Sequence, residues 1–238
     1  MTKINTEYTS QDHEFREQDV YALAKYNWTI RKFRQTGIKE SARIANIGSG
    51  SGTFTKILVK EGYDVFSTEP DNEARNQAKQ NCPGIQFHAY GLFDLPEEEM
   101  FDVIVMHDVL EHIDAEHLAI ETVVKHLNPN GYFLVTVPAS EFLFGHHDTQ
   151  LGHFRRYTRT TMKRALGRNF RLVNLRYFGF FSIPIVWVLS KKMKRDYPQL
   201  GSGKTSLVQR LYGLLCDLEG RIPLPFGTAV LALAQLKD

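Results

Sequence analysis

Short apolar runs alternate with amphipathic segments along most of the chain, and this alternation is typical of an α/β protein. The run 101–108, FDVIVMHD, is apolar almost throughout, which predicts a central strand covered on both faces. Right-handed crossovers should connect the parallel strands. The predicted strands span residues 44–47, 63–68, 85–88, 101–108, 132–138, 170–178 and 228–236.

Helical patterns lie between these strands. Residues 11–33 carry apolar side chains at three- and four-residue steps, which indicates an amphipathic helix ahead of the first strand. Asp71 is a candidate N-cap for one short helix, and Thr158 or Thr160 for another. A further helix has apolar residues from Ile120 to Leu127 on one face and should end at 128–131, NPNG.

The first strand leads into a glycine-rich loop. Gly48, Gly50 and Gly52 alternate in NIGSGSG, and a helical pattern begins at Thr53. Glycine permits positive φ angles and lets a ligand touch the backbone, while the helix N-terminus favours a polar or anionic group. The structural alternative is a tight βα turn without a ligand. The spacing GxGxG differs from the dinucleotide fingerprint GxGxxG, which disfavours a bound dinucleotide.

The second strand ends at Glu69, where doubly wound folds place the acid that binds a ribose diol. Loop and acid together resemble the class I S-adenosylmethionine (SAM) dependent methyltransferases, whose first motif is a strand followed by DxGxGxG. Asn46 stands where that family usually carries the first acid. The resemblance implies SAM as cofactor and a Rossmann-like sheet of seven strands, mostly parallel with an antiparallel last strand and helices on both faces.

The resemblance also implies which residues contact SAM. The segment AYGLFDLP is similar to the one that wraps the adenine, with Gly91 where an acid commonly accepts the exocyclic amine. The N-terminal helix would form a lid that includes Tyr21 and Tyr26, unless these aromatic residues only pack the helix on the sheet. The implied cofactor contacts are Gly48, Ser49, Gly50, Gly52, Glu69, Pro70, Leu92, Phe93, Met106, His107 and Asp108.

The sequence VLEHI follows the central strand and places Asp108, Glu111 and His112 at its carboxyl end, where open α/β sheets bind ligands. This LEH motif is similar to that of small-molecule methyltransferases of the quinone-biosynthesis type. It implies that His112 contacts the acceptor. The alternative is a structural hydrogen bond from His112 at the start of the next helix.

Ionisable residues are concentrated between 141 and 166. A methyl acceptor with a hydroxyl group needs a base, and a histidine beside a carboxylate suits this role at neutral pH. We therefore predict His147 with Asp148, or His153, as the catalytic group. A divalent metal bound by these histidines and the aspartate is an alternative, but the spacing matches no metal motif and we predict no metal.

Two arginines and a tyrosine follow in the same segment. Arg155 and Arg156 suit a carboxylate or phosphate on the acceptor through forked hydrogen bonds, and we predict that they bind the acceptor together with Tyr157. The alternative is that the segment ties a loop to the sheet through its own hydrogen bonds. The GHxRRYT-like pattern also resembles a group within the same methyltransferases.

An insertion, 179–226, separates the last two strands. Its apolar run FFSIPIVWVL is too short to span a membrane and is followed by Lys191, Lys192, Lys194 and Arg195. It could lie on an anionic bilayer, roof an apolar acceptor pocket, or pack on the core. We favour the roof because Pro184 should interrupt an interfacial helix. The stretch GSGKTS is not a phosphate loop, because Pro198 stands where a glycine is needed.

A chain of 238 residues suits one domain, which we divide into a lid (1–40), a SAM-binding half (41–138) and an acceptor-binding half (139–238). The net charge of +2 is too small to indicate nucleic acid. Two cysteines and no apolar leader pattern at the start favour a cytoplasmic protein, with peripheral membrane contact left open.

These patterns predict an enzyme that transfers a methyl group from SAM to an oxygen, in preference to a carbon or nitrogen, of a small-molecule, lipid-linked or glycan-linked acceptor. An NAD(P)-dependent oxidoreductase is disfavoured by the glycine spacing. A SAM-binding module without chemistry is disfavoured by the crowded histidines and arginines. The acceptor and the oligomeric state are not determined by the sequence.

Overall fold

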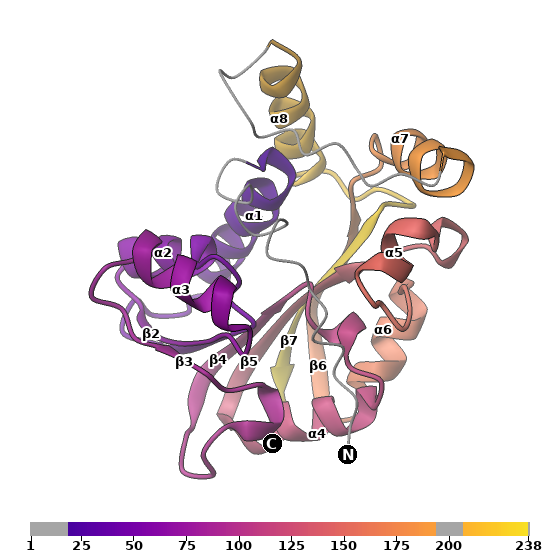
Figure 1. The fold of residues 1–238 in the computed structure, drawn as a ribbon. Helices are drawn as coiled ribbons and strands as arrows, with labels where there is room; N and C mark the ends of the chain where they lie inside the picture. Colours follow the sequence, from indigo (N-terminus) through magenta and orange to yellow (C-terminus); the bar gives the residue numbers. More distant parts are fainter. Residues whose placement is uncertain (1–18, 194–206, 238) are drawn as a thin grey trace.

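A mixed sheet of seven strands organises the protein (Figure 1). The computed structural model describes residues 19–193 and 207–237. The strand order is β3-β2-β1-β4-β5-β7-β6, and β7 is antiparallel to both of its neighbours. The predicted fold class is confirmed. The strands are β1 (Arg43–Ile47), β2 (Asp64–Thr68), β3 (Phe87–His88), β4 (Phe101–His107), β5 (Leu127–Pro138), β6 (Phe170–Phe178) and β7 (Ala229–Leu236).

Helices cover both faces of this sheet (Figure 1), and two large apolar cores and one small one are buried among the described residues. One large core lies under α1, α2 and α8, and the other large core lies under α4 and α6. Strand β4 supplies side chains to both, as its apolar pattern predicted. The helices are α1 (Val20–Thr36), α2 (Thr53–Lys60), α3 (Asn72–Asn81), α4 (Glu116–Lys125), α5 (His146–Gln150), α6 (Arg159–Leu166), α7 (Ile183–Trp187) and α8 (Leu207–Glu219).

Short helical turns complete the fold at the ends of strands. Three are 3₁₀ turns, η3 (Leu92–Asp94), η4 (Leu110–His112) and η5 (Glu141–Leu143), and η6 (Val188–Met193) is a π-helix that continues α7. Strand order reverses between β1 and β4, because the chain adds β2 and β3 on one side of β1 and β4 on the other. An open sheet binds its ligands at the carboxyl ends of the strands beside such a reversal.

Several predicted boundaries differ from the structure. Strand β3 is shorter than predicted, and β4 ends one residue before Asp108, whose φ of 54° takes it out of the extended conformation. Leu127 lies in β5 and not on the preceding helix. The register of β4 and β5 shifts between Phe101 and Val103, and this irregularity lets β5 begin earlier than its apolar run. Residues 11–18 of the predicted first helix lie outside the described residues.

Both predicted N-caps are present. The side chain of Asp71 accepts a hydrogen bond of 2.8 Å from the backbone N–H of Ala74 at the start of α3. Thr158, and not Thr160, caps α6 by accepting from the backbone N–H of Thr161 at 3.1 Å. These caps satisfy backbone donors that a helix leaves open at its first turn.

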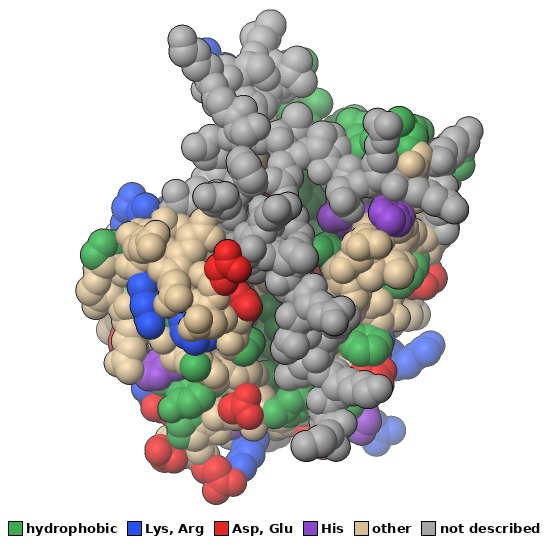
Figure 2. Space-filling model, in the orientation of Figure 1, with side chains coloured by type: hydrophobic (Ala, Val, Ile, Leu, Met, Phe, Trp, Pro, Cys, Tyr) green, Lys and Arg blue, Asp and Glu red, His purple; other side chains and the backbone are tan. Residues whose placement is uncertain are grey.

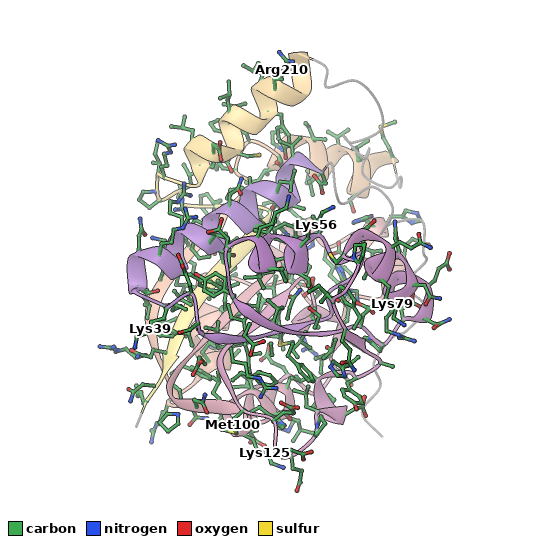
Figure 3. The ribbon with its side chains drawn as sticks, turned by 90° about the vertical axis from the view of Figure 1, so that its left-hand side faces the viewer. Lys39, Lys56, Lys79, Met100, Lys125 and Arg210 are labelled. Atoms are coloured by element: carbon green, nitrogen blue, oxygen red, sulfur yellow. The ribbon has the colours of Figure 1, made fainter. Side chains whose placement is uncertain are left out.

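The described part of the insertion is helical and carries apolar residues on its surface. Pro184 lies in the first turn of α7, where a proline is compatible with a helix, so our expectation that it interrupts this segment is wrong. Helix α8 lies beside α1 and starts near Arg210, at the opposite end of the molecule from Met100 and Lys125 (Figure 3). Lys194, Arg195 and the GSGKTS stretch fall outside the described residues.

Green apolar side chains gather over α7 in the space-filling view (Figure 2). Ile185 is 53% exposed there, and Leu214 on α8 is 67% exposed. Among the residues that the structure describes, no helix has both the length and the apolar character needed to cross a bilayer. The insertion therefore presents an apolar surface without a membrane-spanning helix in its described part.

Candidate active site

The glycine-rich loop makes a compact turn between β1 and α2. Gly48, Gly50 and Gly52 all have positive φ angles, of 67°, 54° and 81°. A Cβ atom added to Gly48 would lie 2.6 Å from the side chain of Val109, which follows β4. Gly48 is therefore needed both for its backbone conformation and for the close approach of the segment after β4.

Glu69 is held beside this loop by backbone donors. Its Oε2 accepts a hydrogen bond of 2.7 Å from the N–H of Gly50, and its Oε1 accepts one of 3.0 Å from the N–H of Asp71. The side chain of Arg75 donates to the Glu69 carbonyl at 2.6 Å, and the exposed Pro70 follows. Doubly wound folds place the acid that binds a ribose diol at this position, directly after the second strand.

Two further observations on this loop bear on SAM. The hydroxyl of Ser49 is buried and makes no hydrogen bond to any residue in the described parts of the chain. The first turn of α2 begins at Gly52, which has no side chain to cap it. A polar ligand group would satisfy such buried donors. The loop, the serine and the acid fit the ribose and the polar end of SAM.

Asn46 makes a buried hydrogen bond behind the glycine-rich loop. Its side chain is buried and donates a hydrogen bond of 2.9 Å to the hydroxyl of Thr55 on α2. Thr55 in turn contacts the hydroxyl of Ser67 on β2 at 2.7 Å. This buried chain of polar groups ties β1, α2 and β2 together. Asn46 is neutral and oriented into the protein, so it contributes no charge to the cofactor site.

The segment implied for the adenine forms the turn η3. Leu92 is buried in the core beneath the sheet, and Phe93 is half-buried at its edge. The N–H of Gly91 donates to the carboxylate of Asp94 at 3.0 Å. An exposed acid therefore does lie beside Gly91, three residues later than the family pattern suggested. Adenine contacts from Leu92 and Phe93 stay a prediction.

The residues at the carboxyl end of β4 face in different directions. Met106 is buried in the core under α4. His107 is buried on the opposite face, where its Nδ1 lies 3.0 Å from the hydroxyl of Thr136 and its ring packs against Tyr26 and Phe54. Both side chains are enclosed by protein, so we expect any cofactor contact of these two residues to come from their backbone.

Asp108 has an ion-pair partner that the sequence pattern did not suggest. Its Oδ2 accepts a hydrogen bond from the ammonium group of Lys25 on α1, and its Oδ1 accepts one of 3.2 Å from Thr136. The Lys25 side chain is 5% exposed, whereas that of Asp108 is 26% exposed. Tyr21 adds a second link from α1, because its hydroxyl lies 2.8 Å from that of Thr228. The N-terminal helix is thus anchored beside the end of β4.

Asp148 is the centre of the histidine and arginine segment. Its carboxylate is fully buried and accepts hydrogen bonds from the Nδ1 of His153 at 2.9 Å, from the backbone of Gly145 at 2.9 Å, and from both Nε and Nη2 of Arg156. Burial alone would raise the pKa of Asp148, but the bonds from His153 and Arg156 lower it to about 2. Asp148 is therefore ionised at neutral pH.

Three of the side chains predicted to bind the acceptor make contacts within the protein itself. Besides Asp148, Arg156 donates to the carbonyl of Ala139 at 3.1 Å. Arg155 donates to the carbonyl of Ile113 at 2.8 Å and to that of Asp114 at 2.7 Å. Tyr157 is 1% exposed and packs in the core. These contacts support the alternative in which the segment ties its loop to the sheet, and acceptor binding by these three residues stays a prediction.

Three side chains come together where η4 meets this segment. The rings of His112 and His153 are 4.7 Å apart in an edge-to-face arrangement, and Glu111 is completely buried beside them. One possible ligand atom of each residue lies within 4.8 Å of the other two, so this group, Glu111, His112 and His153, could hold a divalent cation. The other candidate base, His147, is half-buried on α5.

Comparisons with known proteins agree with this geometry. A methyltransferase domain model matches residues 15–175, and the chain belongs to that family. It is 29% identical over 99 residues to an uncharacterized methyltransferase of Alkaliphilus oremlandii, an alignment that covers 41% of this chain and 46% of that protein. It is 26% identical over 97 residues to the ubiquinone biosynthesis O-methyltransferase of Rickettsia conorii, covering 39% and 34% respectively. The aligned part thus spans less than half of each relative.

Solved structures share the fold across nearly the whole chain. One of them is the N-methyltransferase NodS of Bradyrhizobium japonicum in complex with S-adenosylhomocysteine (SAH), which superposes with a TM-score of 0.58 at 15% identity. The alignment covers 95% of this chain and 98% of the NodS chain. A putative sarcosine dimethylglycine methyltransferase of Galdieria sulphuraria superposes with a TM-score of 0.64 at 14% identity. That alignment covers 91% of this chain and 87% of the Galdieria chain. The chain thus carries a methyltransferase domain, and the comparisons do not favour an oxidoreductase or a module without chemistry.

Proposed function

We propose that the protein transfers the methyl group of SAM to an oxygen of a small-molecule or lipid-linked acceptor, with His153 as the general base. The observation that carries this proposal is the buried pair of Asp148 and His153 at the carboxyl edge of the sheet. The similarity to O-methyltransferases of ubiquinone biosynthesis supports oxygen as the target. In this proposal residues 41–138 bind the cofactor and residues 139–238 bind the acceptor.

The pair determines which ring nitrogen of His153 can act. An ionised carboxylate only accepts hydrogen bonds, so Asp148 requires the proton on Nδ1 of His153. The other nitrogen, Nε2, then has a free lone pair and can take a proton. Arg156 holds Asp148 from the other side and fixes the orientation of the pair. This is the arrangement in which a carboxylate orients a histidine base.

The reaction needs few groups beyond this base. Bound SAM supplies an electrophilic methyl group on a sulfonium. The acceptor oxygen forms a bond to the methyl carbon, the carbon–sulfur bond breaks with its electron pair left on sulfur, and the hydroxyl proton passes to Nε2 of His153. The buried carboxylate of Glu111 near His153 would stabilise the resulting imidazolium. Alignment of the acceptor with the methyl group supplies much of the acceleration.

Turnover of substituted variants tests the base. His153→Ala should lower methyl transfer from labelled SAM to a phenolic acceptor by roughly a hundredfold or more, while SAH affinity measured by calorimetry stays unchanged. His147→Ala is the matched control and should keep most of the activity. Wild-type turnover in His153→Ala would assign the base elsewhere.

A chelator separates base catalysis from metal catalysis at the same cluster. Glu111, His112 and His153 could ligate a cation, so the wild type is also assayed after dialysis against EDTA. The proposal expects unchanged turnover. Activity that is lost with EDTA and restored by a divalent metal would instead assign His153 as a metal ligand.

A further inference from the structure

The helical segment formed by α7 and η6 presents its apolar side chains to solvent. Phe181, Ile185 and Val188 are exposed, and they follow one another at four- and three-residue steps, as residues on one face of a helix do. The buried face carries Ser182 and Ser190 with one valine between them. A helix on the surface of a water-soluble protein normally has its apolar residues toward the core and its polar residues outside. The polarity of this segment is therefore reversed relative to water.

Helix α8 has a similar exposed apolar face. Tyr212 and Cys216 pack in the core under α1. Leu211, Leu214 and Leu218 are exposed, and their three- and four-residue steps place them together on another face of the same helix. The helix thus has one apolar face packed on the protein and a second one that is open to solvent.

Hydrogen bonds join these two segments to each other. The hydroxyl groups of Ser182 and Tyr212 lie 2.6 Å apart. The carboxylate of Glu219, at the end of α8, accepts hydrogen bonds from the backbone N–H groups of Gly179 at 2.6 Å and Phe181 at 2.9 Å. The two exposed faces therefore belong to one unit, and both lie in the upper part of the molecule as Figure 1 shows it.

The charge of the insertion favours an anionic partner. Residues 179–226 contain seven lysines and arginines and three acidic residues, a formal charge of +4, whereas the rest of the chain contains 22 and 24, a charge of −2. Arg210 and Arg221 are exposed before and after the leucines of α8. Four acidic residues lie within 94–99, directly before Met100, at the end of the molecule opposite Arg210 (Figure 3). The apolar surface is therefore at the basic end, and an acid-rich segment is at the other.

We propose that the six exposed apolar side chains of α7–η6 and α8 form a docking surface for an anionic lipid bilayer. The apolar side chains enter the boundary between headgroups and acyl chains, and the cations of the insertion contact the headgroups. A second copy of the chain suits this surface less well, because two insertions with a charge of +4 each would repel one another across a shared interface.

The insertion also packs on the acceptor-binding half. A Cβ atom added to Gly145, at the start of α5, would lie 2.2 Å from the hydroxyl oxygen of Ser190 on η6. Such a close approach requires glycine at this position. Docking therefore brings the acceptor side of the protein close to the membrane. The inference goes beyond the proposed function and is independent of the proposed base and of the atom that is methylated.

Sedimentation of the full chain with sucrose-loaded vesicles tests the docking surface. The wild type should bind phosphatidylglycerol vesicles roughly tenfold or more tightly at low salt than at high salt, and phosphatidylcholine vesicles weakly, because salt screens the attraction of cations to the anionic surface. Replacing Ile185 and Val188 together by glutamine should weaken binding by roughly tenfold or more. The matched control is Leu118→Gln, an exposed leucine on α4, which should bind as the wild type does.

Three results would overturn the proposal in this assay. They are the absence of wild-type binding to phosphatidylglycerol vesicles, unchanged binding by the variant at Ile185 and Val188, and an equal loss in Leu118→Gln. A concentration-dependent dimer without vesicle binding would assign the surface to a second copy. His153→Ala should bind vesicles as the wild type does, so failure of the proposed base would leave this result unaffected.

The two tryptophans of the chain provide a second measurement, which reports where the lipid makes contact. Trp187 on α7 is 40% exposed, whereas Trp28 on α1 is fully buried. Bromine atoms on lipid acyl chains quench the fluorescence of a tryptophan that they contact. Brominated phosphatidylglycerol vesicles should quench the wild type, but they should not quench Trp187→Phe, whose emission comes from Trp28 alone. Unquenched wild-type emission, or equal quenching of both proteins, would contradict docking through this surface.

Discussion

The two sides of the carboxyl edge hold their central carboxylates by different means. Glu69 accepts hydrogen bonds from backbone N–H groups of the adjacent turn and loop. Asp148 is held mainly by the side chains of His153 and Arg156, on a segment whose regular elements before α6 are the short turn η5 and the short helix α5. Backbone donors are available in any sequence that makes the turn, whereas side-chain donors depend on particular residues. The acceptor side should therefore be the more sensitive to substitution.

The largest expected effect comes from removing the buried partner of Asp148. Arg156→Met leaves an uncompensated carboxylate in the interior, which should cost about 3 to 5 kcal/mol of unfolding free energy in urea denaturation. Arg155→Met is the control, since Arg155 mainly donates to backbone carbonyls at the surface and should cost about 1 kcal/mol. Equal losses in the two variants would contradict the central role of Asp148.

On the cofactor side, the backbone conformation of Gly48 is the feature most sensitive to substitution. Gly48→Ala introduces a Cβ at a positive φ and against the side chain of Val109. The substitution should lower the free energy of unfolding by about 2 kcal/mol and should also weaken the binding of SAH. Adding Val109→Ala removes the steric contact but not the conformational strain. We expect the double variant to recover part of the stability in thermal denaturation, and no recovery would indicate that φ alone accounts for the loss.

Low pH should lower the free energy of unfolding through the protonation of Asp148 on the acceptor side. The pKa of Asp148 is about 2 in the folded protein and 3.8 in its ordinary state, so the unfolded chain binds the proton more readily. The resulting stabilisation, about 2 kcal/mol, is present above pH 4 and is lost as the pH falls toward 2. Urea denaturation of wild type and Asp148→Asn across this range checks it: the pH dependence should be weaker in the variant. A parallel fall in both proteins would assign the acid sensitivity to other carboxylates.

The smallest effect on stability is expected at the insertion. Leu211 and Leu214 are exposed on α8, so replacing both with glutamine should change the unfolding free energy by less than about 0.5 kcal/mol per site. If this apolar surface meets a bilayer, the wild type should co-sediment with anionic vesicles and the double variant should bind less. Salt-sensitive binding would indicate a contribution of the insertion's cationic residues Lys191, Lys192, Lys194 and Arg195. Absence of vesicle binding by the wild type would favour a pocket roof.

Local patterns determined much of the cofactor half. The strands β1, β2 and β4, the turn at Gly48–Gly52, the position of Glu69 and the cap Asp71 follow from apolar periodicity and from backbone geometry over a few residues. Such features depend on neighbours in the sequence, so a single chain is enough to predict them. The end of β4 and the start of β5 were less predictable, because the irregular pairing of these strands depends on the whole sheet.

Only the tertiary structure decided which side chains meet at the site. Lys25 and Asp108 are 83 positions apart, and Arg155 reaches carbonyls more than 40 positions away. Nothing in the local pattern indicated that Arg156 would bind Asp148 or that His153 would pack on His112. Apolar periodicity specifies which face of an element is buried, but the partners of a polar side chain are fixed only when distant elements pack and every buried charge must find a counter-charge.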